Sequence, residues 1–215
     1  MRMDDSWFFD WYNGDATDAE RWLCERMEDF DEYFHDMRFK KGTAPYGLIM
    51  CKSKSADSEG WMDDEAQLPE ELELFSYDFF KVRVEELPDC NGYYNHEEQL
   101  LCISPESLGE DSTILHEMLH LHEEVVNELP LYYHDALYWA LYQELREKIA
   151  GLDDAINNHA HVLNGTQIYE EGGLHDILFL LKSFDLDIRK GYPLGTVFGY
   201  GKVDEFKGLG YETNE

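Results

Sequence analysis

One segment near the middle of the chain limits its fold more than any other feature. Residues 113–127 read TILHEMLHLHEEVVN, with no glycine or proline among them. On a helix at ~100° per residue, His116, Glu117 and His120 share a polar arc of about 120°. Leucine, isoleucine, methionine and valine side chains fill most of the opposite side. The pattern predicts a helix that packs one face on a hydrophobic core and presents polar groups on the other.

The segments around this helix predict an α+β fold. Candidate strands cover 80–87, 91–95 and 99–104, and helical spacing covers 16–37, 131–149 and 174–188. Shorter strands are expected at 46–51 and 195–201, with a polar surface loop at 52–69. The central helix is expected to begin near Asp111 or Ser112. Because the strands precede most of the helices, we expect a small, mostly antiparallel sheet packed on the central helix, with flanking helices.

The polar arc contains the pattern H-E-x-x-H, which predicts a zinc site. His116 and His120 stand one turn apart on the same face, so both imidazoles can reach one ion. Glu117 is rotated by ~100° from His116, which keeps it out of the coordination sphere. It can still take a proton from a water molecule activated by the metal. The pattern therefore predicts a Zn²⁺-dependent hydrolase with Glu117 as general base.

A catalytic zinc takes three protein ligands, and the sequence leaves the third open. His134 is the first candidate, because it follows the helix break at Pro130 and heads the apolar stripe of the next helix. Glu123, Glu124 and Glu128 are the alternatives. Glu123 also lies one turn after His120, where its carboxylate could hydrogen-bond a ligand imidazole, and we prefer this role for it.

Three other side chains near the motif have predicted roles. Tyr132 and Tyr133 directly precede His134, and either hydroxyl could stabilise the oxyanion of a tetrahedral intermediate. His122 falls on the apolar side of the helix, so we expect it to be packed or hydrogen-bonded in the core.

The composition limits the kinds of molecule that the chain is expected to bind. The chain has 47 acidic and 17 basic residues, a formal charge of −30. Nucleic-acid affinity depends on Lys and Arg, so this balance disfavours a nucleic-acid partner and favours basic peptide substrates. No apolar run is long enough to span a membrane. The four cysteines form no C-x-x-C pair, and the acidic N-terminus has no secretory pattern, so we expect a cytoplasmic protein with free thiols.

The stretch from 92 to 145 resembles the SprT-like zincins and related minimal zinc peptidases. The resemblance lies in LCIS before the helix, HEMLH within it, and HDALYW in the next helix. It implies a zincin-like core, zinc bound by His116, His120 and His134, Glu117 as general base, and metallopeptidase activity. We expect a single domain: residues 1–75 form an N-terminal helix and acidic loop, 76–150 the zincin core, and 151–215 a C-terminal helical extension.

Two other hypotheses compete with the peptidase. The chain could be a catalytically inactive, acidic zincin-fold protein that binds a basic partner. Its zinc would then be structural and closed by a fourth protein ligand, for which the candidates are Glu123, His122, His159, His161 and His175. Alternatively, the chain could be a metal-free mimic of nucleic acid. The sequence does not indicate an oligomeric state.

Overall fold

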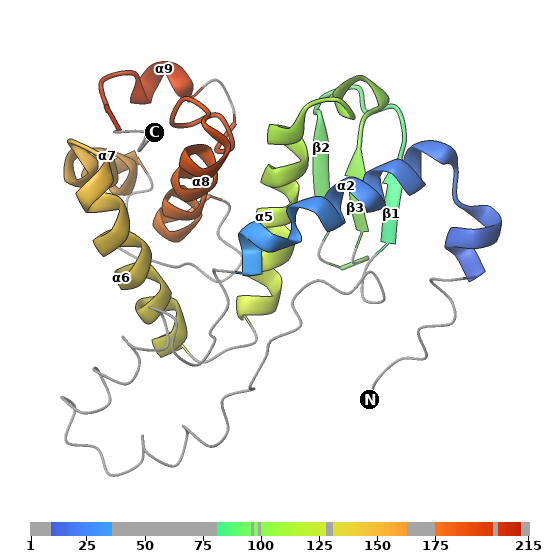
Figure 1. Cartoon of the computed structure of the whole chain (residues 1–215), viewed down its shortest axis with the longest axis horizontal. Coiled ribbons are helices and arrows are strands. Elements are labelled where there is room, and N and C mark those ends of the chain that lie inside the picture. Colours follow the sequence, from blue (N-terminus) through green and yellow to red (C-terminus); the bar gives the residue numbers. More distant parts are fainter. Residues whose placement is uncertain are drawn as a thin grey trace, which may run out of the picture.

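The computed structural model describes residues 10–35, 81–95, 97–98, 100–127, 131–162, 175–199 and 202–211. These residues form an α+β structure with a small sheet and mostly helices (Figure 1). The sheet, α2 and α5 lie on one side, and α6, α7, α8 and α9 lie on the other (Figure 1). The predicted strand at 46–51 and loop at 52–69 fall outside the described residues.

The sheet has three short strands: β1 (Lys81–Val84), β2 (Gly92–Asn95) and β3 (Leu100–Ile103). The strands predicted at 80–87, 91–95 and 99–104 are confirmed. Their order is β1-β3-β2, so β3 is central, and its four residues are all buried. The predominantly apolar sequence LLCI suits a strand covered on both faces.

The expectation of a mostly antiparallel sheet is wrong for one of the two pairings. β2 runs antiparallel to β3, but β1 runs parallel to it. The chain reverses direction between β1 and β2 and again between β2 and β3, so β3 regains the direction of β1. Because β3 then lies between the other two strands, β2 is left as an edge strand of the sheet.

Two helices pack on this sheet. A π-helical turn, η1 (Trp11–Asp15), precedes α2 (Asp18–His35). Thr17 and Glu20 form a reciprocal capping box: the Glu20 amide donates to Thr17 Oγ1 (3.2 Å), and the Thr17 amide donates to Glu20 Oε2 (2.8 Å). The apolar residues of α2 that pack into the core are Leu23, Met27, Phe30 and Phe34.

A 3₁₀ turn, η2 (Pro105–Ser107), leads into the second helix, α5 (Asp111–Asn127). α5 begins at Asp111, as predicted, and its apolar side is fully buried at Ile114, Leu115, Met118 and Leu119. It packs on β2, β3, α2 and α8. Asp111 also ties α5 to α2, because Arg26 Nη2 lies 2.6 Å from its carboxylate.

The C-terminal half contains α6 (Leu131–Lys148), α7 (Leu152–Val162), α8 (Ile177–Lys190) and the short α9 (Val203–Phe206). The helices predicted at 131–149 and 174–188 are confirmed as α6 and α8, whereas α7 was not predicted. α8 contacts α5, α6 and α7, and every residue from Ile177 to Asp187 is buried. It is therefore a central helix, although its sequence pattern is that of an amphipathic helix.

The strand predicted at 195–201 is wrong over the described residues, which form turns up to Gly199. Gly195 and Gly199 have positive φ angles of 91° and 78°, outside the range of an extended strand.

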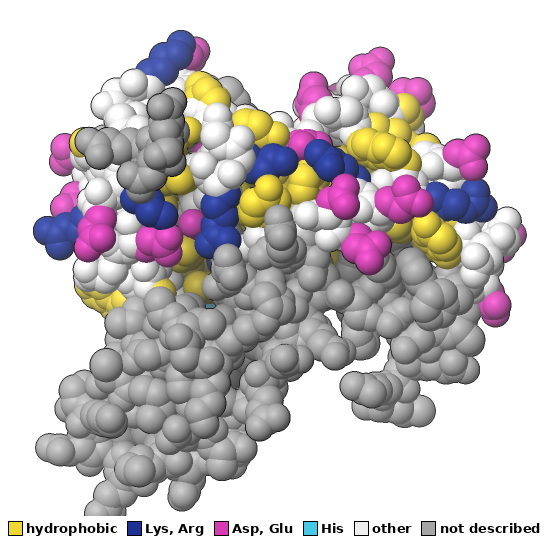
Figure 2. Space-filling view, in the orientation of Figure 1, with side chains coloured by type: hydrophobic (Ala, Val, Ile, Leu, Met, Phe, Trp, Pro, Cys, Tyr) yellow, Lys and Arg dark blue, Asp and Glu magenta, His cyan; other side chains and the backbone are white. Residues whose placement is uncertain are grey.

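Charge is spread over the visible surface. On the face shown in Figure 2, acidic side chains are scattered over the described elements, with lysines and arginines between them. Within the described residues, no helix has the length and hydropathy needed to cross a membrane.

Candidate metal centre

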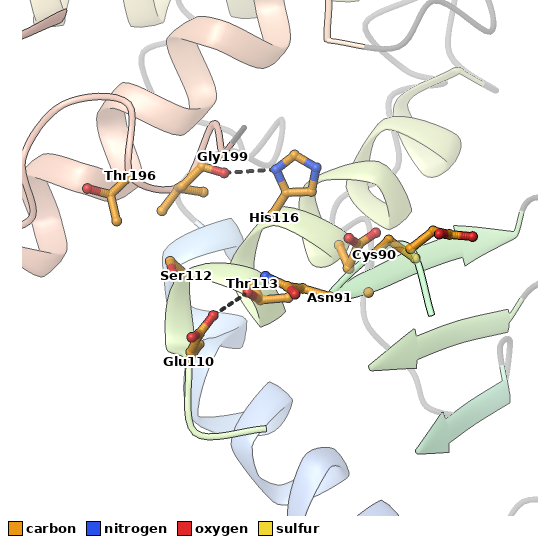
Figure 3. Close-up of a pocket in the computed structure, with 12 residues that line it drawn as sticks. Cys90, Asn91, Glu110, Ser112, Thr113, His116, Thr196 and Gly199 are labelled. Atoms are coloured by element: carbon orange, nitrogen blue, oxygen red, sulfur yellow. Dashed lines mark hydrogen bonds between the residues drawn. The ribbon is translucent and has the colours of Figure 1, made fainter. Parts of the chain in front are cut away.

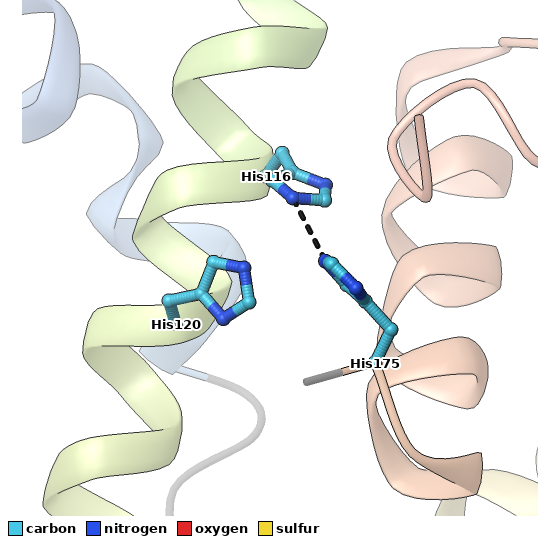
Figure 4. A group of neighbouring side chains, drawn as sticks. All are labelled: His116, His120 and His175. Atoms are coloured by element: carbon cyan, nitrogen blue, oxygen red, sulfur yellow. Dashed lines mark hydrogen bonds between the residues drawn. The ribbon is translucent and has the colours of Figure 1, made fainter. Parts of the chain in front are cut away.

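Three histidines converge where α5 meets the start of α8 (Figure 4). One ring nitrogen from each of His116, His120 and His175 lies within 4.8 Å of the others. The Nε2 atoms of His116 and His175 are 3.1 Å apart. Two nitrogen ligands at about 2.0–2.1 Å from a tetrahedral zinc ion stand ~3.3 Å apart. The spacing of these two nitrogens therefore fits a shared metal ion.

The His116 ring is held in a single tautomer. Its Nδ1 lies 2.8 Å from the carbonyl oxygen of Val197. A carbonyl only accepts, so Nδ1 carries the hydrogen and Nε2 presents its lone pair towards His175. A hydrogen bond from the distal ring nitrogen to a backbone carbonyl is typical of metal-bound histidine.

The three imidazoles are kept neutral. Burial lowers the pKa of His116 below its usual value. Burial, followed by repulsion from the neighbouring histidines, lowers the pKa of His120 to about 3 and that of His175 to about 4. Neutral imidazole is the form that binds metal, so the three rings are in the ligand state at neutral pH.

Glu117 lies beside these rings and is 5% exposed. Burial raises the pKa of its carboxyl to about 8, and a hydrogen bond with the Tyr94 backbone opposes that shift. The edge strand β2 passes close to the Glu117 side chain at Gly92. A Cβ atom placed there would lie 3.1 Å from Glu117 Cγ and 2.8 Å from Ile103 Cδ1. Glycine therefore lets β2 approach the carboxylate closely, a requirement that the sequence analysis missed.

A cavity of about 450 Å³ opens next to His116 and Glu117 (Figure 3). The residues that line it come from the start of β2, the start of α5 and the 195–199 turn: Asp89, Cys90, Asn91, Gly92, Glu110, Ser112, Thr113, His116, Glu117, Thr196, Val197 and Gly199. These described residues include three carboxylates and no lysine or arginine. A ligand in this cavity would meet hydroxyl, amide and acidic groups.

Glu123 is a buried acid that lies near His120 and pairs with the buried Lys182. Lys182 Nζ, on α8 and 0% exposed, is 3.4 Å from Glu123 Oε1. The other carboxylate oxygen, Oε2, is 3.9 Å from His120 Nδ1. Burial raises the pKa of Glu123 to about 7, and Lys182 opposes this rise. The predicted placement of Glu123 next to a ligand imidazole matches this geometry, although 3.9 Å exceeds hydrogen-bonding distance.

Removing the amine of Lys182 is expected to destabilise the fold. In the metal-free protein, Lys182→Met should lower the free energy of unfolding in urea by about 3 kcal/mol, because it leaves the buried Glu123 carboxylate without its ion-pair partner. The matched control is Lys148→Met, which breaks the partly exposed pair with Glu144 and should cost less than about 1 kcal/mol. Similar losses in the two variants would contradict this interpretation.

The third member of the cluster is His175, and His134 lies outside it. His134 is buried in the first turn of α6. α8 packs against both α5 and α6, and the residue before its N-cap brings an imidazole to the α5 histidines. His134 is close to α5 along the chain, but its ring is not among the clustered nitrogens.

The other predicted residues are placed as follows. His122 is 0% exposed, and its ring packs against Phe34 with centroids 5.8 Å apart, consistent with the predicted core position. The side chains of Glu124, Tyr132, Tyr133 and His161, and the whole of Glu128, lie outside the described part of the structure. His159 Nε2 lies 2.7 Å from the carbonyl oxygen of His175.

Comparison with known protein families, curated proteins and solved structures finds no match for this chain. The resemblance to SprT-like zincins therefore stays a prediction. The case for a metal site rests on the three converging histidines.

Proposed function

We propose that this chain is a zinc-dependent metallopeptidase with a zincin-like core, in which His116, His120 and His175 hold the metal. The observation that carries the proposal is the convergence of three imidazoles, two of them in an H-E-x-x-H helix, beside the buried carboxylate of Glu117. Three histidines form a known ligand set for catalytic zinc, with the fourth position left for water. His175 replaces His134 as the proposed third ligand.

Glu117 is the proposed general base. Bound zinc would polarise the substrate carbonyl and make the attacking water more acidic. The Glu117 carboxylate would accept a proton from that water and deliver it to the leaving amide nitrogen as the C–N bond breaks. The site favours this role because burial raises the pKa of Glu117 to about 8, which makes its carboxylate a stronger base than an exposed glutamate.

The cavity supports a peptide substrate. Among the described residues, its lining has no lysine or arginine, the residues that usually hold phosphate, so these residues do not suit a phosphate ester. Asp89 and Glu110 lie on its wall, and neither forms an ion pair with a basic residue in the described part of the chain. We therefore propose peptides with basic side chains as the preferred substrates, since opposite charges attract across the contact.

The proposal is tested by incubating the zinc-loaded protein with a mixed-sequence peptide library and identifying products by mass spectrometry. We expect cleavage near Lys or Arg, loss of cleavage after treatment with 1,10-phenanthroline, and recovery when zinc is added back. Cleavage that survives complete metal removal would contradict a zinc mechanism. A protein that binds zinc but cleaves nothing would favour the inactive binding protein.

A further inference from the structure

The backbone of His175 has a left-handed conformation that is unusual for a residue other than glycine. Its φ angle is 64°, and among the described residues it is the only non-glycine residue with positive φ. The Cβ atom makes this left-handed region unfavourable for most residues. Such residues persist where the surroundings hold them, and they are concentrated at functional sites.

His159, on α7, contacts the backbone at this point. Its Nε2 lies 2.7 Å from the carbonyl oxygen of His175, and a carbonyl only accepts, so Nε2 is the donor. The His159 ring also packs edge-on against Phe198, with centroids 5.3 Å apart and planes at 89°. Phe198 in turn contacts the His175 ring, with centroids 5.5 Å apart. His159 therefore contacts the backbone of His175 directly and its ring through Phe198.

The residue after His175 is fixed as well. The Asp176 side chain caps α8 by accepting from the Phe179 amide at 2.8 Å. His175 is thus held on both sides along the chain: the residue after it caps α8, and its own carbonyl oxygen accepts a hydrogen bond from His159 on α7. His116 and His120 need no such device, because a single helix already sets their spacing.

We infer that His159 is a positioning residue for the metal centre: its hydrogen bond holds the left-handed backbone that aims the His175 imidazole at His116 and His120. His159 is not among the three clustered ligands, and it acts through the carbonyl of His175. The inference rests on the proposed metal site. Without the donor, His175 is free to leave the left-handed region, so the metal should bind more weakly and dissociate faster.

Two substitutions separate the donor from the ring. His159→Phe keeps an aromatic ring against Phe198 but removes the N–H donor to the His175 carbonyl. His159→Gln removes the ring but keeps an amide N–H donor of similar reach. His159→Asn, with a shorter amide, repeats the loss of the donor with a small polar side chain. The measurements are the zinc dissociation constant by competition with a chromophoric chelator, the zinc release rate, and the melting temperature of the metal-free protein.

We expect His159→Phe and His159→Asn to weaken zinc binding by about 10- to 100-fold with faster release, and His159→Gln to stay within about threefold of the unmodified chain. A purely structural role would instead lower the melting temperature of the metal-free protein and leave the dissociation constant unchanged. That result would overturn the inference and leave the proposed function unaffected. Equal weakening of zinc binding by His159→Phe and His159→Gln would do the same. An unmodified chain that binds no zinc would overturn both.

Discussion

Substituting His175 with alanine is expected to weaken zinc binding by more than about 100-fold, whereas His134→Ala should leave it within a few fold. The reason is geometric. The Nε2 atom of His175 is 3.1 Å from that of His116, and the His134 side chain is buried in α6 outside the cluster. In the proposed site, His175 is also the only ligand that α5 does not supply.

The two variants form a matched pair, because each replaces a histidine by the same small side chain. Zinc affinity is measured by competition with a chromophoric chelator, and urea unfolding of the metal-free proteins separates lost stability from lost coordination. The reverse pattern, with His134→Ala losing the metal and His175→Ala keeping it, would favour the ligand set implied by the SprT-like resemblance and would contradict the site described above.

Glu117→Gln is expected to lower kcat by about 10²- to 10⁴-fold while the protein keeps its zinc. Glutamine has nearly the same shape as glutamate, so the approach of β2 at Gly92 is preserved, but an amide cannot accept the proton from the attacking water. The measurement is the hydrolysis of a peptide identified from the library, with the zinc content of the same samples determined in parallel.

Glu147→Gln is the control for that substitution, because Glu147 is exposed on α6 and the change removes the same charge away from the cavity. It should retain full activity. If Glu117→Gln retained full activity, Glu117 would not be the base. If it lost zinc together with activity, its role would be in metal binding.

The local parts of the site follow from the sequence. The spacing of His116 and His120 is a property of one helix, and the amphipathic pattern that predicted α5 is confirmed by its buried apolar side. Glu123 was placed beside His120 by the same helical geometry. The strand at 80–87 was predicted from its alternating pattern, and the one at 91–95 from the turn signal before it. These features depend on neighbours within a few residues, and local patterns are sufficient to predict them.

The third histidine depends on tertiary structure, which the sequence pattern did not resolve. His175 meets His116 only because α8 packs on α5, and its left-handed backbone has no sequence signature. One signal was present: Asp176 before an apolar run is typical of a helix N-cap, so His175 stands at the start of a helix, where a side chain can face a neighbouring helix. His134 was preferred because the connection from α5 is short.

The burial of α8 does not follow from its sequence, because the helix contains charged residues. Lys182 and Asp187 are charged residues of the amphipathic segment ILFLLKSFDLDI, yet both are 0% exposed. Lys182 pairs with Glu123, and Asp187 accepts hydrogen bonds from the Gly195 and Val197 amides at 2.7 and 2.9 Å. Their partners come from α5 and the 195–199 turn, so burial follows from contacts that periodicity does not reveal.

The most direct test of the proposed metal centre is the zinc content of the untagged protein, measured by elemental mass spectrometry after purification without chelator and again after incubation with zinc and desalting. The account predicts about one zinc per chain, lost in His175→Ala. A protein that carries no zinc and takes up none would contradict the account, and the three histidines would then be a packed, metal-free cluster.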